Sequence, residues 1–158
     1  MADVDQARPE TAGVLAPPPL IFAVPLTVGL LLQWWQPVHL IPQRLAAPLG
    51  LTALALGLMA IPAILAFRRA KTSPVPYKPT TALVITGPYR VTRNPMYLGF
   101  ALLYLGTTLW VNTVWPALLL PFVIIVMHYG VITREEAYLT RLFGDEYRAY
   151  LRRVRRWI

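Results

Sequence analysis

Long uncharged hydrophobic stretches alternate with short polar segments along this chain. The stretches at residues 15–35 and 45–67 each approach or exceed the roughly 20 apolar residues that cross a bilayer as a helix. A third stretch, residues 94–133, is too long for one span and is interrupted by Asn112-Thr113, with Trp110 and Trp115 on either side. Because Trp favours the membrane interface, we expect a tight hairpin of two spans there. The pattern predicts an all-α, polytopic membrane protein with four transmembrane helices.

The polar C-terminal segment continues the helical pattern beyond the last hydrophobic stretch. Residues 133–143 are expected to extend the fourth span as a helix, and Gly144 to cap it. A second short helix is predicted from about residue 145, and its apolar positions recur at the helical spacing that places them on one face. These positions are Tyr147, Tyr150, Leu151 and Val154. We therefore expect amphipathic cytoplasmic helices after the last span, either lying on anionic lipid or forming part of a site.

The composition supports the membrane assignment and excludes several chemistries. Of the 158 residues, 56% are hydrophobic and 14% charged, whereas soluble domains have about 45–50% and 25%. The chain has no Cys, which excludes disulfides, thiolate metal sites and a Cys nucleophile. It also lacks a G-x-G pair, a Walker motif and H-E-x-x-H. We expect His39 and His128 to be packed or surface residues, and we predict no metal site.

The charges predict the orientation of the chain in the membrane. Residues 68–93 carry six Lys or Arg and no acid, and residues 134–158 carry seven Arg against four acids. The opposite side carries only Arg44. The positive-inside rule then places both termini in the cytoplasm, with a bacterial inner membrane as the expected location. The net charge of +8 thus orients the protein in a lipid bilayer and does not indicate nucleic acid as a partner.

We divide the chain into three regions. Residues 1–13 form an N-terminal cytoplasmic tail, and residues 14–79 contain two spans and the start of a cytoplasmic loop. Residues 80–158 form the core that carries the candidate chemistry. The role of the first two spans stays open at this point.

Polar side chains are expected to gather where the hairpin leaves the membrane. Its two arms rise about 25 Å and 30 Å at 1.5 Å per residue, so Arg93 and Glu135 should lie at similar depth. Ionisable groups at such a depth are costly and suggest function, although a juxtamembrane salt bridge would explain them equally well. A cluster of Arg, Tyr and Glu suits a zwitterion such as S-adenosylmethionine (SAM). Arg can bind its carboxylate, Glu its ammonium, and Tyr its sulfonium.

Five short motifs follow one another in residues 80–158. They are Gly87-Pro88-Tyr89-Arg90, Arg93-x-Pro95-x-Tyr97-x-Gly99, Glu135-Glu136, Phe143-Gly144-x-Glu146-Tyr147-x-x-Tyr150 and Val154-x-Arg156-Trp157. In this order and spacing the chain resembles the isoprenylcysteine carboxyl methyltransferase and phospholipid methyltransferase superfamily of integral membrane enzymes. The resemblance implies SAM bound in a cytoplasm-facing pocket between the last spans and the C-terminal helices.

The resemblance also implies the residues of the cofactor site. Arg93, Tyr97, Glu135 and Glu136 map to the cofactor-binding region, together with Asn94, which stands where the family usually has His. Further wall residues implied in the same way are Tyr89, Arg90, Tyr147, Arg156 and Trp157. Arg155 replaces a proline that relatives carry near the end of the pattern. No catalytic residue is assigned.

The methyl acceptor and two alternative functions stay open. The acceptor is either lipophilic or a small thiol, carboxylate or amine at the cytoplasmic face. Sterol reductases share a similar R-H-P-x-Y-x-G element, so an NADPH-dependent membrane oxidoreductase is one alternative. A non-catalytic four-span module is the other, although it does not explain why the motifs occur in family order.

Overall fold

The computed structural model describes residues 11–76 and 78–158 and is all-α, as predicted. Residues 1–10, most of the predicted N-terminal tail, lie outside the described part. A 3₁₀ turn, η1 (Gly87–Arg90), precedes the second half of the chain, and a π-helical turn, η2 (His128–Ile132), follows α5. The α-helices are α1 (Pro18–Trp35), α2 (Gln43–Gly57), α3 (Ala60–Arg69), α4 (Pro95–Val111), α5 (Val114–Met127) and α6 (Thr133–Arg153).

Three helical segments of the described chain are long and apolar enough to cross a membrane. They are Pro18–Trp35, Gln43–Arg69 and Val114–Arg153. The helix α4 is also apolar but shorter, with 17 residues. The prediction of a polytopic, all-α membrane protein is therefore confirmed.

The helical hydrogen bonding of the second hydrophobic stretch is interrupted before Pro62. The stretch divides at Leu58 and Met59 into α2 and α3. Pro62 has no N–H to donate to the carbonyl of Leu58, and its ring crowds that carbonyl, so the helical ladder is interrupted there. Pro25, Pro48 and Pro121 also lack this donor, yet α1, α2 and α5 continue through them. A proline in these helices thus breaks the ladder at one position and is accommodated at three.

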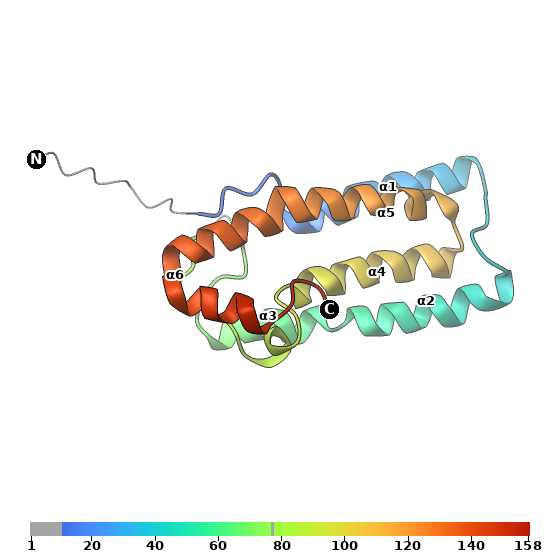
Figure 1. The fold of residues 1–158 in the computed structure, drawn as a ribbon. Helices are drawn as coiled ribbons and strands as arrows, with labels where there is room; N and C mark the ends of the chain where they lie inside the picture. Colours follow the sequence, from blue (N-terminus) through green and yellow to red (C-terminus); the bar gives the residue numbers. More distant parts are fainter. Residues whose placement is uncertain (1–10, 77) are drawn as a thin grey trace, which may run out of the picture.

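The long helices pack as two pairs, α1 with α5 and α2 with α4 (Figure 1). Small residues allow α2 and α4 to approach closely, as is common between membrane helices. A Cβ added at Gly50 would lie 2.5 Å from the backbone nitrogen of Trp110, and one at Gly106 would lie 2.7 Å from that of Leu54. Residues from α1, α4, α5 and η2 fill the space between the pairs, among them the buried Phe22, Tyr104, Met127 and Val131.

The two-residue turn at Asn112 and Thr113 joins α4 to α5, as predicted. Asn112 has the left-handed conformation (φ 56°) that Asn tolerates better than most residues. Its buried side chain accepts hydrogen bonds from the backbone N–H groups of Leu40 and Ile41, at 3.1 and 3.0 Å. It also donates to the carbonyl of Ile41 and to the side chain of Gln43, at 2.9 and 2.8 Å. One amide therefore joins the two helix–helix connections at this end of the bundle.

We predict that the substitution Gly50→Ala destabilises the protein, because its methyl group meets the backbone of Trp110. Overpacking of this kind costs about 1–3 kcal/mol, and here rigid backbone leaves little room for relaxation. Thermal unfolding in detergent, followed by circular dichroism, would show a lower midpoint. Leu49→Ala on the exposed side of the same helix is the control and should change stability little. An unchanged midpoint for Gly50→Ala would contradict the close approach of α2 and α4.

Asn112→Gly tests the amide separately from the backbone, because Gly adopts the left-handed conformation freely. The variant leaves the N–H groups of Leu40 and Ile41 without their partner. We expect a loss of about 2–4 kcal/mol in unfolding free energy, since an unpaired buried group costs about 1–3 kcal/mol. Denaturant titration measures this loss. Gln33→Ala removes one exposed hydrogen bond in the same region and should cost much less; equal losses would argue against a special role for Asn112.

Candidate functional site

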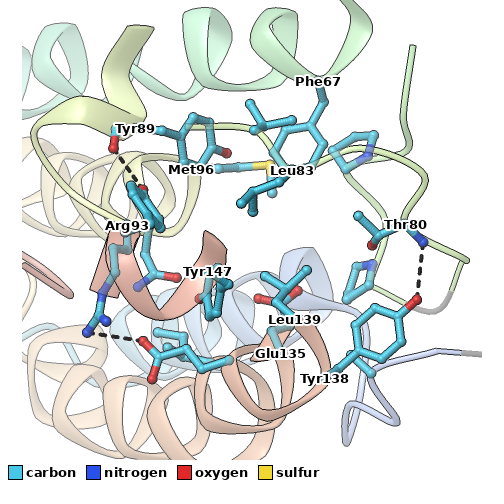
Figure 2. A pocket seen from close by; sticks show the side chains of 18 of the residues that line it. Phe67, Thr80, Leu83, Tyr89, Arg93, Met96, Glu135, Tyr138, Leu139 and Tyr147 are labelled. Atoms are coloured by element: carbon cyan, nitrogen blue, oxygen red, sulfur yellow. Dashed lines mark hydrogen bonds and ion pairs between the residues drawn. The ribbon is translucent and has the colours of Figure 1, made fainter. Parts of the chain in front are cut away.

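A cavity opens at the end of the bundle opposite the Asn112 turn. The space between its walls that no protein atom fills is about 750 Å³, open solvent at its mouth included. Its walls come from α3, the segment between α3 and α4, the start of α4, and α6 (Figure 2). Ala12, from the segment that precedes α1, also lines it. The cavity thus draws on both the region before residue 80 and the core that follows.

A sharp change of direction inside α6 closes one side of the cavity. Gly144 interrupts the helix with φ 55° and ψ −124°, a conformation open to glycine. The last part of α6 therefore turns back, and the predicted aromatic face reaches the cavity. Tyr147 and Tyr150 are 3% and 4% exposed, and the Tyr150 hydroxyl donates to the carbonyl of Tyr89 at 2.7 Å. The aromatic face of this helix is buried against protein rather than resting on lipid.

The charged residues meet at the start of α4 and the start of α6, as the hairpin geometry predicts. The Tyr97 hydroxyl donates to Glu135 at 2.7 Å, and an Arg93 nitrogen lies 3.2 Å from Glu136. Tyr97 is 3% exposed, and the side chains of Arg93 and Glu136 are 13% and 15% exposed. The structure therefore brings these four residues together at the cavity wall, in two neighbouring pairs.

Arg93 has hydrogen-bonding capacity that the described protein does not use. Its Nε is buried and has no partner among residues 11–76 and 78–158. A buried guanidinium nitrogen without an acceptor is costly, because the group has lost water and gained nothing. An anionic group in the cavity could supply the acceptor, and a carboxylate matches the planar fork of Arg. The residues present thus fit the carboxylate of a zwitterionic ligand.

The wall opposite these charges is apolar and aromatic. Phe67 and Tyr89 pack edge to face with ring centroids 5.5 Å apart, and Leu83 and Met96 lie beside them (Figure 2). Burial raises the pKa of the Tyr89 hydroxyl above its ordinary value, and Glu135 adds to the shift, so this phenol stays neutral at physiological pH. A flat, uncharged group of a ligand would find its most favourable surface here.

The segment after α6 folds back onto the start of α4. The backbone N–H of Arg93 donates to the carbonyl of Arg155 at 2.9 Å, and residues 92 and 155 form an isolated parallel bridge. The Asn94 side chain, which lines the cavity, donates to the carbonyl of Arg156 at 2.9 Å. Thr92 donates to the same carbonyl at 3.1 Å. The amide that stands in place of the family's His is therefore used to hold the C-terminal segment.

Three expected wall residues lie outside the cavity lining. Arg90 is exposed and faces a separate groove beside Arg153. Trp157 packs against the apolar core between the helix pairs. Arg156 lies behind Glu136 and forms a two-pronged ion pair with it, including Nε to Oε1 at 3.0 Å. This hydrogen bond holds the pKa of Arg156 above its ordinary value.

Sequence reasoning missed part of the lining. The sequence did not indicate Phe67, Leu83 or the segment around Pro74 and Pro76, because these residues belong to no motif or periodic pattern. Met96 was not indicated either, because it stands at a variable position of the second motif. Tyr138 and Leu139 were also missed. Their spacing from Glu135, three and four residues along one helix, places them on the same face and could have indicated them.

The two histidines have different surroundings. His39 lies near the carbonyl of Asn112, at 3.3 Å from Nδ1. The Nε2 of His128 lies 3.0 Å from a guanidinium nitrogen of Arg156. His128 is thus connected to the charged cluster, although the sequence suggested only a packed or surface residue. Among the described residues, no group of His, Asp and Glu could hold a metal ion.

Comparison with known proteins is consistent with this arrangement. Over 63 residues, 40% of this chain, it is 44% identical to an uncharacterized protein of Haemophilus influenzae, whose whole length is covered. Over 72 residues it is 39% identical to protein-S-isoprenylcysteine O-methyltransferase of Schizosaccharomyces pombe; this match covers 46% of the chain and 30% of the yeast protein. No solved structure matches at a significant level. The phospholipid methyltransferase family matches residues 44–146, well over half of the chain, and the chain therefore belongs to this family of membrane methyltransferases.

Proposed function

We propose that this protein is an integral membrane methyltransferase that uses SAM, and that the cavity at the start of α4 and α6 is its cofactor site. The family uses SAM, which supports the choice of cofactor. The observation that carries the proposal is the buried Arg93, whose Nε lacks a partner among the described residues, beside Glu135 in the same cavity. A guanidinium and a carboxyl group on the wall of one cavity match the carboxylate and ammonium of one amino-acid group.

Each wall residue then has a role that its chemistry supports. Arg93 holds the cofactor carboxylate, and Glu135, oriented by Tyr97, accepts from the ammonium or a ribose hydroxyl. Tyr147 and the apolar wall around Phe67 exclude water and offer aromatic surface. SAM, when bound, supplies an electrophilic methyl group on its sulfonium. The protein contributes positioning of the reactants and a dry surrounding, which is most of what methyl transfer requires.

The proposed membrane arrangement has four spans, with α4 as the third and with both termini in the cytoplasm. A 17-residue helix rises about 25 Å, slightly less than the roughly 30 Å hydrocarbon core. Trp34, Trp35, Trp110 and Trp115 lie near the Asn112 turn, as expected for residues at a membrane interface. The cavity then opens on the opposite, basic side, which we assign to the cytoplasmic face of a bacterial inner membrane.

We propose a lipophilic acceptor, or a small thiol, carboxylate or amine, that reaches the cavity from the membrane or the cytoplasm. The apolar wall supports a hydrocarbon-bearing acceptor, because such a molecule concentrates in the bilayer beside α4. The similarity to the yeast isoprenylcysteine methyltransferase supports the same class. The match covers 30% of the yeast protein, so the substrate of the yeast enzyme is not assigned to this protein.

We predict that purified protein in detergent binds S-adenosylhomocysteine (SAH) and that Arg93→Ala and Glu135→Gln weaken this binding. Each variant removes a charged hydrogen bond worth about 1.5–3 kcal/mol, which corresponds to roughly 10- to 100-fold in Kd. Isothermal titration calorimetry measures the change, and thermal unfolding checks that the variants remain folded.

Two exposed positions on α6 provide matched controls. Arg152→Ala and Glu146→Gln change the same charges away from the cavity and should leave SAH affinity unchanged. Unchanged affinity in both Arg93→Ala and Glu135→Gln would remove the proposed site. Binding of NADPH without binding of SAH would instead favour an oxidoreductase.

A further inference from the structure

The carboxylate of Glu136 is fully engaged by two arginines. Oε1 accepts from Arg156 Nε at 3.0 Å and lies 3.2 Å from Arg93, while Oε2 accepts from the second prong of Arg156. Of the two adjacent glutamates, Glu136 therefore has both carboxylate oxygens paired with protein side chains. Glu135 accepts from Tyr97 and is the one that remains to meet a ligand.

Arg156 is in turn held from behind by His128. Arg can donate hydrogen bonds but cannot accept them, so the 3.0 Å contact requires that His128 Nε2 be the acceptor. His128 is therefore neutral, with its proton on Nδ1. It begins the π-helical turn η2, an irregularity that occurs often at functional sites. The backbone of Arg156 is fixed as well, because its carbonyl accepts from Thr92 and Asn94.

These contacts form one continuous series from His128 through Arg156 and Glu136 to Arg93. Arg93 lies on the cavity wall, whereas His128 and Arg156 do not. The three charged members carry two positive charges and one negative charge, so one positive charge is left over. Because Glu136 fixes the guanidinium of Arg93 at one nitrogen, the remaining donors face a defined direction and are preorganised for an anion.

We propose that His128 and Arg156 are positioning residues, which act through Glu136 to orient the Arg93 guanidinium toward the carboxylate of the bound cofactor. This proposal rests on the proposed function and gives a positioning role to two residues that do not touch the ligand. If His128 had a purely structural role instead, its loss would weaken the binding of every ligand of the cavity to the same extent.

The test compares two ligands that differ in the amino-acid group, whose carboxylate Arg93 would hold. SAH carries this carboxylate and an ammonium, and 5′-methylthioadenosine has the same thionucleoside without either. We expect His128→Leu to raise the Kd for SAH about tenfold, as the loss of one hydrogen bond to a charged group implies. The affinity for methylthioadenosine should stay within about twofold of the wild type, since loss of the charged-group contact does not affect it. His128→Gln, whose carbonyl can accept from Arg156, should restore most of the SAH affinity.

Several results would overturn the proposal. If His128→Leu weakened the binding of both ligands equally, His128 would have a structural role. The same conclusion would follow if His128→Gln did not restore the SAH binding that His128→Leu loses. Unchanged SAH affinity in His128→Leu, with binding lost in Arg93→Ala, would refute the positioning role and leave the proposed function intact. Absence of SAH binding in the wild type would instead refute the proposed function.

A second variant keeps the test valid if His128→Leu does not fold. Arg156→Lys keeps the positive charge but loses the two-pronged contact with Glu136 and the donor to His128. It should show the same difference between the two ligands, weaker SAH and unchanged methylthioadenosine. Equal affinities of Arg156→Lys and wild type for SAH would overturn the proposal independently of His128.

Discussion

The ion pair of Glu136 with Arg93 and Arg156 is the interaction on which the candidate site depends. It joins three segments that are distant in the sequence: the start of α4, the start of α6 and the end of the chain. A half-buried carboxylate loses solvation, and that loss is offset only by well-aligned partners. Glu136 has three such donors, from two guanidiniums. Without it, the direction of the Arg93 guanidinium would not be fixed, and the C-terminal segment would be held only by its backbone contacts with residues 92–94.

The membrane sets where such an interaction can form. Ionised side chains are expensive in hydrocarbon, so the long helices carry almost none. The two ends of the bundle therefore differ. At the end with the Asn112 turn, the Asn112 amide forms hydrogen bonds with the backbone of the connection between α1 and α2, so these polar groups are paired within the protein. At the other end, α6 turns back at Gly144 and closes a cavity whose charged wall comes from residues that the hairpin has returned to the same depth.

The sequence predicted the parts of this fold that follow from hydrophobicity and helix geometry. The hairpin at residues 112–113 and the proximity of Tyr97 to Glu135 follow from apolar length and from the rise of a helix. The break between α2 and α3 lies where Pro62 removes a backbone donor, but a proline alone does not mark such a break, because α1, α2 and α5 continue through theirs. The contact of His128 with Arg156 was not predicted from the sequence. It depends on a π-helical turn and a folded-back C-terminus, and no local pattern marks either of them.

The pair Glu135-Glu136 shows how one helix can separate structural from chemical roles. Successive residues of a helix point about 100° apart, so adjacent carboxylates cannot share the same partners. Glu136 faces the arginines and is neutralised, whereas Glu135 faces Tyr97 and the cavity. The cluster thereby keeps one unbalanced positive charge near Arg93, while Glu135, whose pKa burial raises to about 7, lines the same cavity as a hydrogen-bond acceptor. A zwitterion would place its carboxylate at Arg93 and its ammonium at Glu135, and the ammonium would favour the ionised form of that carboxyl group.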